Sequence, residues 1–382
     1  MPPIRVLVVD DSVVVRRLVA DVLAGDPDID VIGTASNGQL ALTKIAQMKP
    51  DLVTFDIEMP VMDGVTAVRA LRASGSTVPV IMFSTLTERG ASATLDALEA
   101  GASDYVTKPA SAASLAHSLE QVRAVLVPKI RALVPRRGAG HRPPPPARAT
   151  AHAAPPPRTR PPATSGPAQP AARRTSDAPF QILAIGCSTG GPDALTKVLT
   201  TLPADLTVPV VVVQHMPPVF TKQFAARLDR NLPLTVVEAS GGETLRPGHV
   251  YIAPGDFHLR VTMRGMGMAT VLDQGEPENF CRPAVDVLFT SVATAYRGNV
   301  LGVVLTGMGQ DGRRGSQQVV TAGGSVIVQD EPTSVVWGMP GSVANAGLAE
   351  DILPLADIGA TIMRRLANRP AGTRVPALGG AR

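Results

Sequence analysis

The chain has 382 residues, of which 45% are hydrophobic and only 3% aromatic, and its formal net charge is +4. This length suggests two or three domains, and the ten lysines and arginines between residues 129 and 178 have no aromatic residue among them, which argues against a surface that stacks nucleic-acid bases. Two cysteines exclude a disulfide framework or a four-ligand zinc site, and without a signal peptide or an apolar run of roughly 18 residues we expect a cytoplasmic protein that does not insert into membranes.

Residues 1–125 alternate between short β-branched runs and amphipathic segments. The runs predict strands and the segments predict helices. We expect strands at Ile4–Val9, 31–32, 52–55, 80–83 and 105–106, and helices at Val13–Ala24, 38–47, 65–74 and 91–100. This alternation is typical of a doubly wound α/β domain, in which helices cover both faces of a parallel sheet.

Acidic residues follow the first and third of these strands. Asp10 and Asp11 come directly after the first strand, Asp56 follows the third, and Lys108 follows the fifth. Sites in a doubly wound sheet form at the carboxyl ends of its strands. Carboxylates in this number suit Mg²⁺, and a lysine would offset an added phosphoryl group. A surface turn or a helix cap could explain either acidic run alone, but not both runs together with the lysine.

A change of composition separates this part from the rest of the chain. Residues 126–179 are rich in proline, alanine and arginine, and we expect an extended linker that is partly polyproline II. The alternation resumes at 180–368, with strands expected at 182–185, 209–213, 234–237, His249–Ile252, 300–305 and 325–328, and helices at 193–201, 221–231, 284–295 and 312–321. This predicts a second doubly wound, mainly parallel domain, followed by a flexible tail at 369–382.

Three glycine-rich turns each follow a β-branched run in the second domain. GCSTGGP (186–192), QHMPP (214–218) and GMGQDG (307–312) present a serine, a histidine and an aspartate at strand ends. These residue types supply the nucleophile, general base and orienting carboxylate of a serine hydrolase, so Ser188, His215 and Asp311 are our candidate catalytic residues. The first turn also matches the nucleophile-elbow pattern G-x-S-x-G, but the histidine precedes the aspartate, unlike the order in α/β-hydrolases.

Two other interpretations of these turns are open. Cys187 could be the nucleophile, although neighbouring side chains that leave a strand point in opposite directions and Ser188 is the one flanked by the turn glycines. The GMGQDG run, with Asp330 after the next strand, matches a dinucleotide-binding fingerprint. Against that interpretation, Asp311 would lie where the pyrophosphate binds and would repel it.

Two less specific alternatives concern the same domain. Arg282, Pro283 and Asp286, in CRPAVD, could line a substrate cleft or could simply begin a helix, and we favour the helix start. The domain could also be a phosphorylation-dependent adaptor that only binds a partner, because a sequence does not show whether the three candidate catalytic side chains meet in space.

Residues 1–125 resemble a response-regulator receiver domain, on the DD pair, the TFDIEMPVMDG segment and the KP pair described above. The resemblance implies that a histidine kinase phosphorylates Asp56. It implies that Asp10, Asp11, Asp56 and the Glu58 carbonyl hold Mg²⁺. It also implies that Ser84 and Lys108 contact the phosphoryl group and that Tyr105 is a switch residue.

Residues 180–368 resemble the catalytic domain of the CheB-type chemotaxis methylesterases. The motifs that carry the resemblance are IGCSTGG, VVVQHMP, YIAPGDFHL, RPAVDVLF, LTGMGQDG and QDEPTSVVWGMP. The resemblance implies a monomer that hydrolyses glutamyl methyl esters, and deamidates glutamines, on the cytoplasmic helices of chemoreceptors, with no metal in the catalytic domain. We further hypothesise that phosphorylation of Asp56 relieves an obstruction of the esterase cleft by the receiver.

Overall fold

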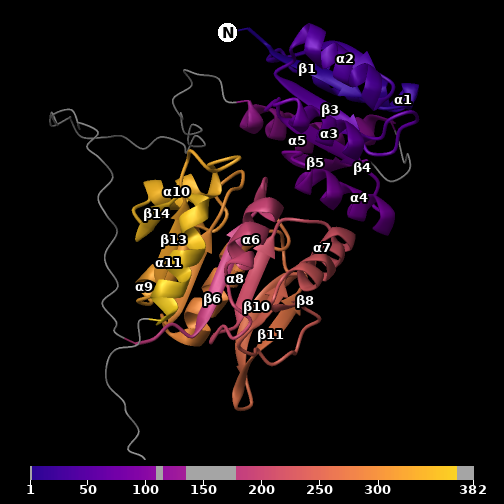
Figure 1. The fold of residues 1–382 in the computed structure, drawn as a ribbon. Coiled ribbons are helices and arrows are strands. Elements are labelled where there is room, and N and C mark those ends of the chain that lie inside the picture. The colour runs from indigo at the N-terminus through magenta and orange to yellow at the C-terminus, as the bar shows by residue number, and fades with distance from the viewer. Residues whose placement is uncertain (1, 109–114, 135–177, 368–382) are drawn as a thin grey trace, which may run out of the picture.

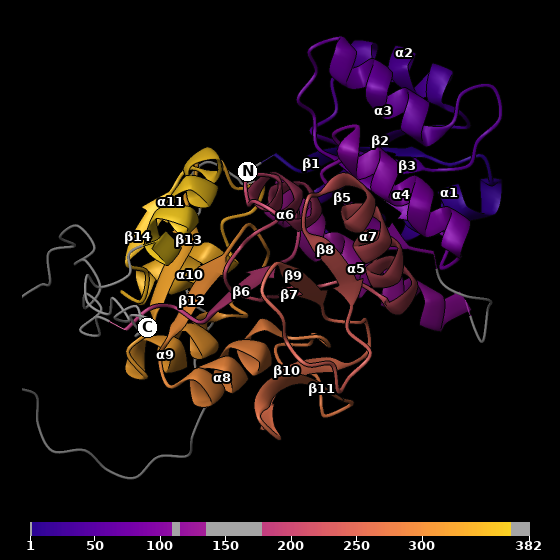
Figure 2. The same ribbon diagram turned by 60° about the horizontal axis from the view of Figure 1, so that its bottom comes forward.

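The computed structural model describes residues 2–108, 115–134 and 178–367, which form two large sheets, each with helices on both faces, and a separate two-stranded ribbon (Figure 1, Figure 2). The fold class predicted from the sequence, two doubly wound α/β units, is confirmed. Most of the expected linker (126–179) and all of the expected tail (369–382) lie outside the described residues.

The first sheet has five strands, all parallel, in the order β2-β1-β3-β4-β5. Its elements are β1 (Ile4–Val9), α1 (Val13–Ala24), β2 (Ile29–Ala35), α2 (Gly38–Met48), β3 (Leu52–Asp56), α3 (Gly64–Ala73), β4 (Val80–Ser84), α4 (Glu88–Glu99), β5 (Asp104–Thr107) and α5 (Leu115–Leu133). Helices α1 and α5 pack on one face, and α2, α3 and α4 pack on the other. The strand order reverses between β1 and β3, so the loops at their carboxyl ends open into one crevice.

Burial on both faces explains why these strands are continuous apolar runs. In β1, Val6 and Val8 belong to the core on the α1–α5 side, and Leu7 and Val9 belong to the core on the other side, because successive side chains point to opposite faces. Helices α1 to α4 each begin after a side chain that accepts a backbone N–H, from Ser12, Asn37, Asp63 and Thr87 respectively. These caps stabilise the helix starts, which the sequence predicted to within a turn.

Helix α5 crosses the boundary that we expected between the first domain and the linker. Its later residues include Leu126, Ile130 and Leu133, which are buried against β1 and α1. Our reading of residues 126–179 relied on proline and arginine content and missed this apolar spacing of three to four residues, which is typical of a helix. Residues 126–133 are therefore helical and packed, not extended.

The second sheet has seven strands, all parallel, in the order β14-β13-β12-β6-β7-β9-β8. Its elements are β6 (Ile182–Cys187), α6 (Gly191–Thr200), β7 (Val210–Gln214), α7 (Pro218–Asn231), β8 (Thr235–Glu238), β9 (His249–Ile252), α8 (Val285–Tyr296), β12 (Val300–Val304), α9 (Arg313–Thr321), β13 (Ser325–Gln329), α10 (Met339–Asn345), β14 (Asp351–Leu353) and α11 (Leu355–Ala367). Helices α6, α7 and α11 cover one face, and α8, α9 and α10 cover the other. The chain leaves β6 for β7 on one side and later returns to β12 on the other, which makes β12, β6 and β7 neighbours at the centre.

Several elements of this part were not predicted from the sequence. They are the antiparallel ribbon of β10 (His258–Arg264) and β11 (Gly267–Asp273), and also α10, β14 and α11. The ribbon packs on α8 and lies beside the main sheet (Figure 2). Its strands mix apolar with charged and glycine residues, so their periodicity is weak in the sequence.

Candidate active site

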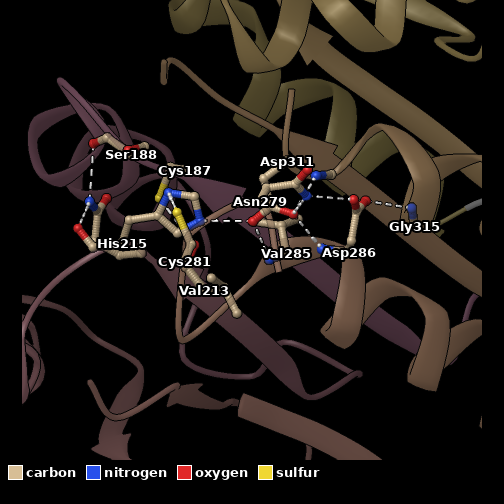
Figure 3. A network of polar contacts seen from close by, with 12 residues as sticks. Cys187, Ser188, Val213, His215, Asn279, Cys281, Val285, Asp286, Asp311 and Gly315 are labelled. Atoms are coloured by element: carbon tan, nitrogen blue, oxygen red, sulfur yellow. Dashed lines mark hydrogen bonds and ion pairs between the residues drawn. The ribbon is translucent and has the colours of Figure 1, made fainter. Parts of the chain in front are cut away.

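Three neighbouring strands bring the candidate catalytic residues to one edge of the second sheet. Ser188 follows β6, His215 follows β7, and Asp311 lies in the loop between β12 and α9. The carboxyl ends of parallel neighbours meet at the same edge. Figure 3 shows all three residues in one polar network at this edge, with His215 between Ser188 and Asp311.

The turn that carries Ser188 is fixed by backbone contacts on both sides. The Ser188 N–H donates to the Thr306 carbonyl (3.0 Å), and the Gly191 N–H donates to the Ser188 carbonyl (2.7 Å). Gly190 has a φ of +73°, a backbone conformation that glycine adopts without strain. A Cβ atom on Gly307 would come within 2.8 Å of the Ser188 Cβ. Gly190 in this turn and Gly307 in the neighbouring turn are therefore required by the local geometry.

His215 and Asp311 form a close pair. The His215 Nε2 lies 2.8 Å from the Asp311 Oδ2, and Asp311 is almost fully buried. Its carboxylate also accepts the backbone N–H groups of Val285 (2.7 Å) and Asp286 (2.9 Å) at the start of α8, where a helix favours negative charge. Burial raises the pKa of Asp311, but the hydrogen bond from His215 and these amides outweigh it and leave the pKa below 3.8.

The imidazole of His215 is engaged at both nitrogens. Its Nδ1 lies 3.5 Å from the Cys281 Sγ. Burial lowers the pKa of His215, but the hydrogen bonds with Asp311 and Cys281 outweigh burial and raise the pKa from 6.5 to about 10. Among the described side chains the Ser188 hydroxyl makes no hydrogen bond to this ring. A general base must lie within hydrogen-bond reach of the proton that it removes, so the Ser188 hydroxyl and the ring would have to move closer together for proton transfer.

The competing interpretations of these turns fit the geometry less well. Cys187 is fully buried, its Sγ contacts the Val213 carbonyl at 3.8 Å, and burial raises the pKa of its thiol, so it is not placed as a nucleophile. Asp311 lies two residues before α9, where the dinucleotide-binding interpretation places the pyrophosphate, and its carboxylate would repel that group. Asp286 lies in the first turn of α8, as the helix-start interpretation predicts, and accepts the N–H of Gly315 on α9 (2.6 Å).

The first α/β unit covers the mouth of this site. Asp104 of β5 accepts a hydrogen bond from the Thr189 hydroxyl (2.6 Å) and pairs with Lys129 of α5 (2.8 Å). Tyr105 stacks on Phe220 of α7, with ring centroids 4.7 Å apart and planes 5° apart. These contacts place the β5–α5 edge of one unit directly beside the residue that follows Ser188.

The space left at Ser188 is small. A cavity of about 20 Å³ is lined from the first unit by Leu98, Asp104, Tyr105 and Lys129, and from the second by Ser188, Thr189, Gly190, Pro192, Gln214 and His215. That volume holds about one water molecule. The side chain of a protein substrate needs more space than this cavity provides while the two units are in this arrangement.

Ion pairs join α4 to α7 beside this contact. Arg227 pairs with Asp96 (2.6 Å) and with Glu99, and Lys222 lies 3.9 Å from Glu88. The Arg227 side chain is only 20% exposed, so it is less screened by solvent than a typical surface pair. The basic residues are on the second unit and the acids on the first, which makes the contact electrostatically complementary.

The predicted metal ligands converge at the carboxyl ends of β1 and β3. Ligand atoms of Asp10, Asp11 and Asp56 lie within 4.8 Å of one another. Lys108 lies 3.0 Å from Asp10 and 2.8 Å from Asp56. Burial raises the pKa of Asp56, Lys108 opposes that effect, and the charge of Asp10 raises the pKa further. Three carboxylates with one ammonium leave excess negative charge, so this donor set fits a hard divalent cation such as Mg²⁺.

The remaining receiver candidates lie near this cluster. Ser84 ends β4, is buried, and donates to the Gly90 carbonyl (3.0 Å). The Glu58 side chain is exposed and pairs with Arg89 (3.3 Å), and its carbonyl remains a predicted ligand. Tyr105 is buried, and burial raises the pKa of its phenol well above 10. The structure therefore places Tyr105 at the contact with α7 and the other candidates around Asp56.

Sequence reasoning missed several residues of the site. Thr189, Asp104, Phe220 and Arg227 make the contact between the two units, and Asn279 donates to Asp311 (3.2 Å). Contacts between separate domains leave no periodic signal in a sequence. The sequence shows the motifs in which some of these residues lie, but it does not show which residues they contact.

Two families of known proteins match separate parts of the chain. Residues 183–362 match the family described as CheB methylesterase, and residues 6–120 match the response regulator receiver domain. No helix of the described part of the chain is long and apolar enough to cross a membrane.

The relatives match over nearly the whole chain. A protein-glutamate methylesterase/protein-glutamine glutaminase of Nocardioides sp. is 60% identical, over 99% of this chain and 99% of its own length. One from Trichodesmium erythraeum is 46% identical, over 96% of this chain and all of its own length. One from Paramagnetospirillum magneticum is 47% identical, over 96% of this chain and 97% of its own.

Proposed function

The chain belongs to the CheB methylesterase family, and we propose that it hydrolyses glutamyl methyl esters, and deamidates glutamine side chains, on chemoreceptors. The observation that carries this proposal is the convergence of Ser188 with the His215–Asp311 pair, joined at 2.8 Å, at the carboxyl edge of β12, β6 and β7. Release of methanol from a methyl-esterified receptor fragment, and of ammonia from its glutamine form, tests the proposal. Release of neither product by the phosphorylated protein would contradict it.

The proposed mechanism uses acyl chemistry. His215 removes the proton from Ser188, whose oxygen attacks the side-chain carbonyl of the substrate. Asp311 holds the ring tautomer through Nε2 and stabilises the imidazolium. His215 then gives the proton to the leaving methanol or ammonia, and a water molecule activated by the same base hydrolyses the acyl-enzyme.

We also propose that phosphorylation of Asp56 by a histidine kinase controls access to Ser188. Asp10, Asp11, Asp56 and the Glu58 carbonyl would hold Mg²⁺, which offsets negative charge on the phosphoryl group. Lys108 already contacts Asp56 and would pair with the added group. The small cavity and the Thr189–Asp104 contact support obstruction of the site by the receiver in the unphosphorylated state.

The remaining parts of the proposal follow from these roles. We propose a receiver that ends with α5, a linker after residue 134, and a catalytic domain from about residue 180 to 368. The protein would act in the cytoplasm, as a monomer, on the helical cytoplasmic part of a receptor. Sedimentation of the purified protein tests the oligomeric state.

Replacement of the phosphoacceptor should separate regulation from catalysis. Asp56→Asn is expected to leave basal hydrolysis unchanged and to abolish activation by a small-molecule phosphodonor with Mg²⁺. Because burial and Asp10 raise the pKa of Asp56, its ionised form opposes folding at pH 7, and the amide should increase the free energy of unfolding.

Two measurements check this prediction. Urea unfolding should show the gain at pH 7, and the gain should shrink as the pH falls through the raised pKa of the folded protein and vanish below 3.8, the ordinary pKa of the carboxyl. Mg²⁺ should raise the Tm of the wild type more than that of the variant, because the variant lacks one carboxylate ligand. Equal activation of both proteins by the phosphodonor would rule out Asp56 as the acceptor.

The pH dependence of hydrolysis should report His215. Because the pKa of His215 is raised from 6.5 to about 10, the unphosphorylated protein should have an acid limb in kcat/KM above pH 6.5, where the ring must lose a proton before it can act as base. The same shift should stabilise the fold fully below pH 6.5, and this stabilisation should be lost as the pH rises through about 10. An acid limb at or below pH 6.5 would contradict the prediction.

A further inference from the structure

One tight turn contacts both members of the histidine–aspartate pair. Glu278 and Cys281 exchange two backbone hydrogen bonds (3.1 and 2.8 Å). The two residues between them, Asn279 and Phe280, have φ values of +51° and +63°, which L-residues seldom adopt. Strained backbone of this kind persists where the surrounding structure requires it.

The side chains of this turn alternate between the site and solvent. The Asn279 amide nitrogen lies 3.0 Å from Asp286 and 3.2 Å from the Asp311 Oδ1. The Cys281 Sγ lies 3.5 Å from the His215 Nδ1. Phe280, between them, is fully exposed. Figure 3 shows Asn279 beside Asp311 and Cys281 against the imidazole ring of His215.

We propose that the turn of residues 278–281 positions the catalytic pair, with Cys281 holding the His215 ring through Nδ1 and Asn279 holding the Asp311 carboxylate. This inference rests on the proposed role of His215 as general base. It adds two positioning residues that touch the base and its carboxylate rather than the substrate.

The chemistry of sulfur suits the role of Cys281. With Nε2–H donated to Asp311, a neutral ring has its lone pair at Nδ1, and a thiol can donate weakly to that lone pair. When the ring is protonated, Nδ1–H can donate to sulfur, which is also a weak acceptor. Cys281 is thus a partner of Nδ1 in both protonation states, and its weak contact holds the ring in place until the Ser188 proton is transferred to the same nitrogen.

Charged groups of the described residues around the histidine–aspartate pair are themselves partnered, including Glu278 of the turn, which pairs with Arg314. Asp311 lies at Nε2, and Asp286 is reached through Asn279. Asp104 and Lys129 of the receiver side line the small cavity next to the ring and pair with each other. Loss of the Cys281 sulfur should therefore change the pH dependence through Nδ1 alone.

Steady-state kinetics of the phosphorylated full-length protein across pH test the proposal. Cys281→Ala is expected to lower kcat by about tenfold, less than the roughly 100-fold that a misplacement of 1 Å can cost. KM should not change, and the acid limb should move to lower pH, because one contact that favours the protonated ring is gone. Cys281→Ser should recover part of both effects, because a hydroxyl also donates and accepts hydrogen bonds.

Asn279→Ala should also lower kcat, but it should move the acid limb the other way. Asp311 loses a donor, its carboxylate holds the imidazolium more strongly, and the ring gives up its proton at higher pH. Phe280→Ala is the matched control in the same turn, and its kcat and acid limb should match the wild type because its side chain touches neither group.

The outcomes separate this inference from the proposed function. If the pH profiles of Cys281→Ala and the wild type superimpose while Ser188→Ala is inactive, the positioning role of Cys281 is overturned. The proposed mechanism is then unaffected. An active Ser188→Ala would overturn the mechanism on which the inference rests. If Cys281→Ala does not fold, Cys281→Ser decides the matter, and a profile identical to that of the wild type in kcat and acid limb would count against the proposal.

Discussion

Ser188→Ala should hydrolyse a methyl-esterified receptor fragment at least on the order of 10⁴-fold more slowly than the wild type, because it removes the atom that forms the acyl-enzyme. The fold should tolerate the change. The turn is held by the backbone of Ser188, and its hydroxyl makes no hydrogen bond with the described residues. The free energy of unfolding should therefore change by less than about 1 kcal/mol.

The neighbouring residue provides a matched control. Cys187→Ala removes a buried sulfur from β6 and should lower the free energy of unfolding by about 1–2 kcal/mol through the cavity that it leaves. Its hydrolytic rate should stay within a few-fold of the wild type. Methanol release and urea unfolding on the same preparations measure both effects. A Cys187→Ala protein as inactive as Ser188→Ala, or an active Ser188→Ala, would reverse the assignment of the nucleophile.

The strands and helices that pack against the core along their whole length were predictable from the sequence. β1 and α1 were predicted with the bounds that they have, because β1 is apolar at every position except Arg5 and Ser12 caps α1. The ribbon β10–β11 and the end of α5 were not predicted. The ribbon is partly exposed, and the helical spacing of Leu126, Ile130 and Leu133 lies next to proline-rich sequence that obscured it.

The candidate catalytic residues were predictable for a topological reason. Ser188, His215 and Asp311 each follow a strand, and parallel neighbours bring such positions together. Asn279 and Cys281 come from a loop before α8, and nothing in their spacing indicates that they reach Asp311 and His215. Their contacts depend on a turn whose two central residues have positive φ values. Glycine often adopts this conformation, but it was not expected for Asn279 and Phe280.

The covering of Ser188 by the receiver predicts a large rise in activity when the two units separate. Phosphorylation of Asp56 in the full-length protein, or use of a fragment of residues 178–382, should raise the hydrolytic rate of the unphosphorylated protein by roughly 5–150-fold, the range of a coupling free energy of about 1–3 kcal/mol. The fragment should show no response to a phosphodonor. A fragment no more active than the unphosphorylated protein would contradict obstruction by the receiver.

A charge reversal tests the same contact without removing a domain. Arg227→Asp places an acid opposite Asp96 and Glu99, which replaces attraction by repulsion across α4 and α7. It should raise the rate of the unphosphorylated full-length protein by several-fold, because part of this pair is screened by solvent. Adding Asp96→Arg to that variant should restore most of the inhibition.

The control for this charge reversal lies on the far side of the receiver sheet. Arg17→Asp breaks an exposed pair with Asp21 within α1 and should leave the rate unchanged. If Arg227→Asp alone has no effect, the ion pairs do not stabilise the closed form, and Tyr105 stacked on Phe220 with the Thr189–Asp104 hydrogen bond must hold it. If the double variant stays as active as Arg227→Asp, the gain comes from a change within α7 and not from the contact between the units.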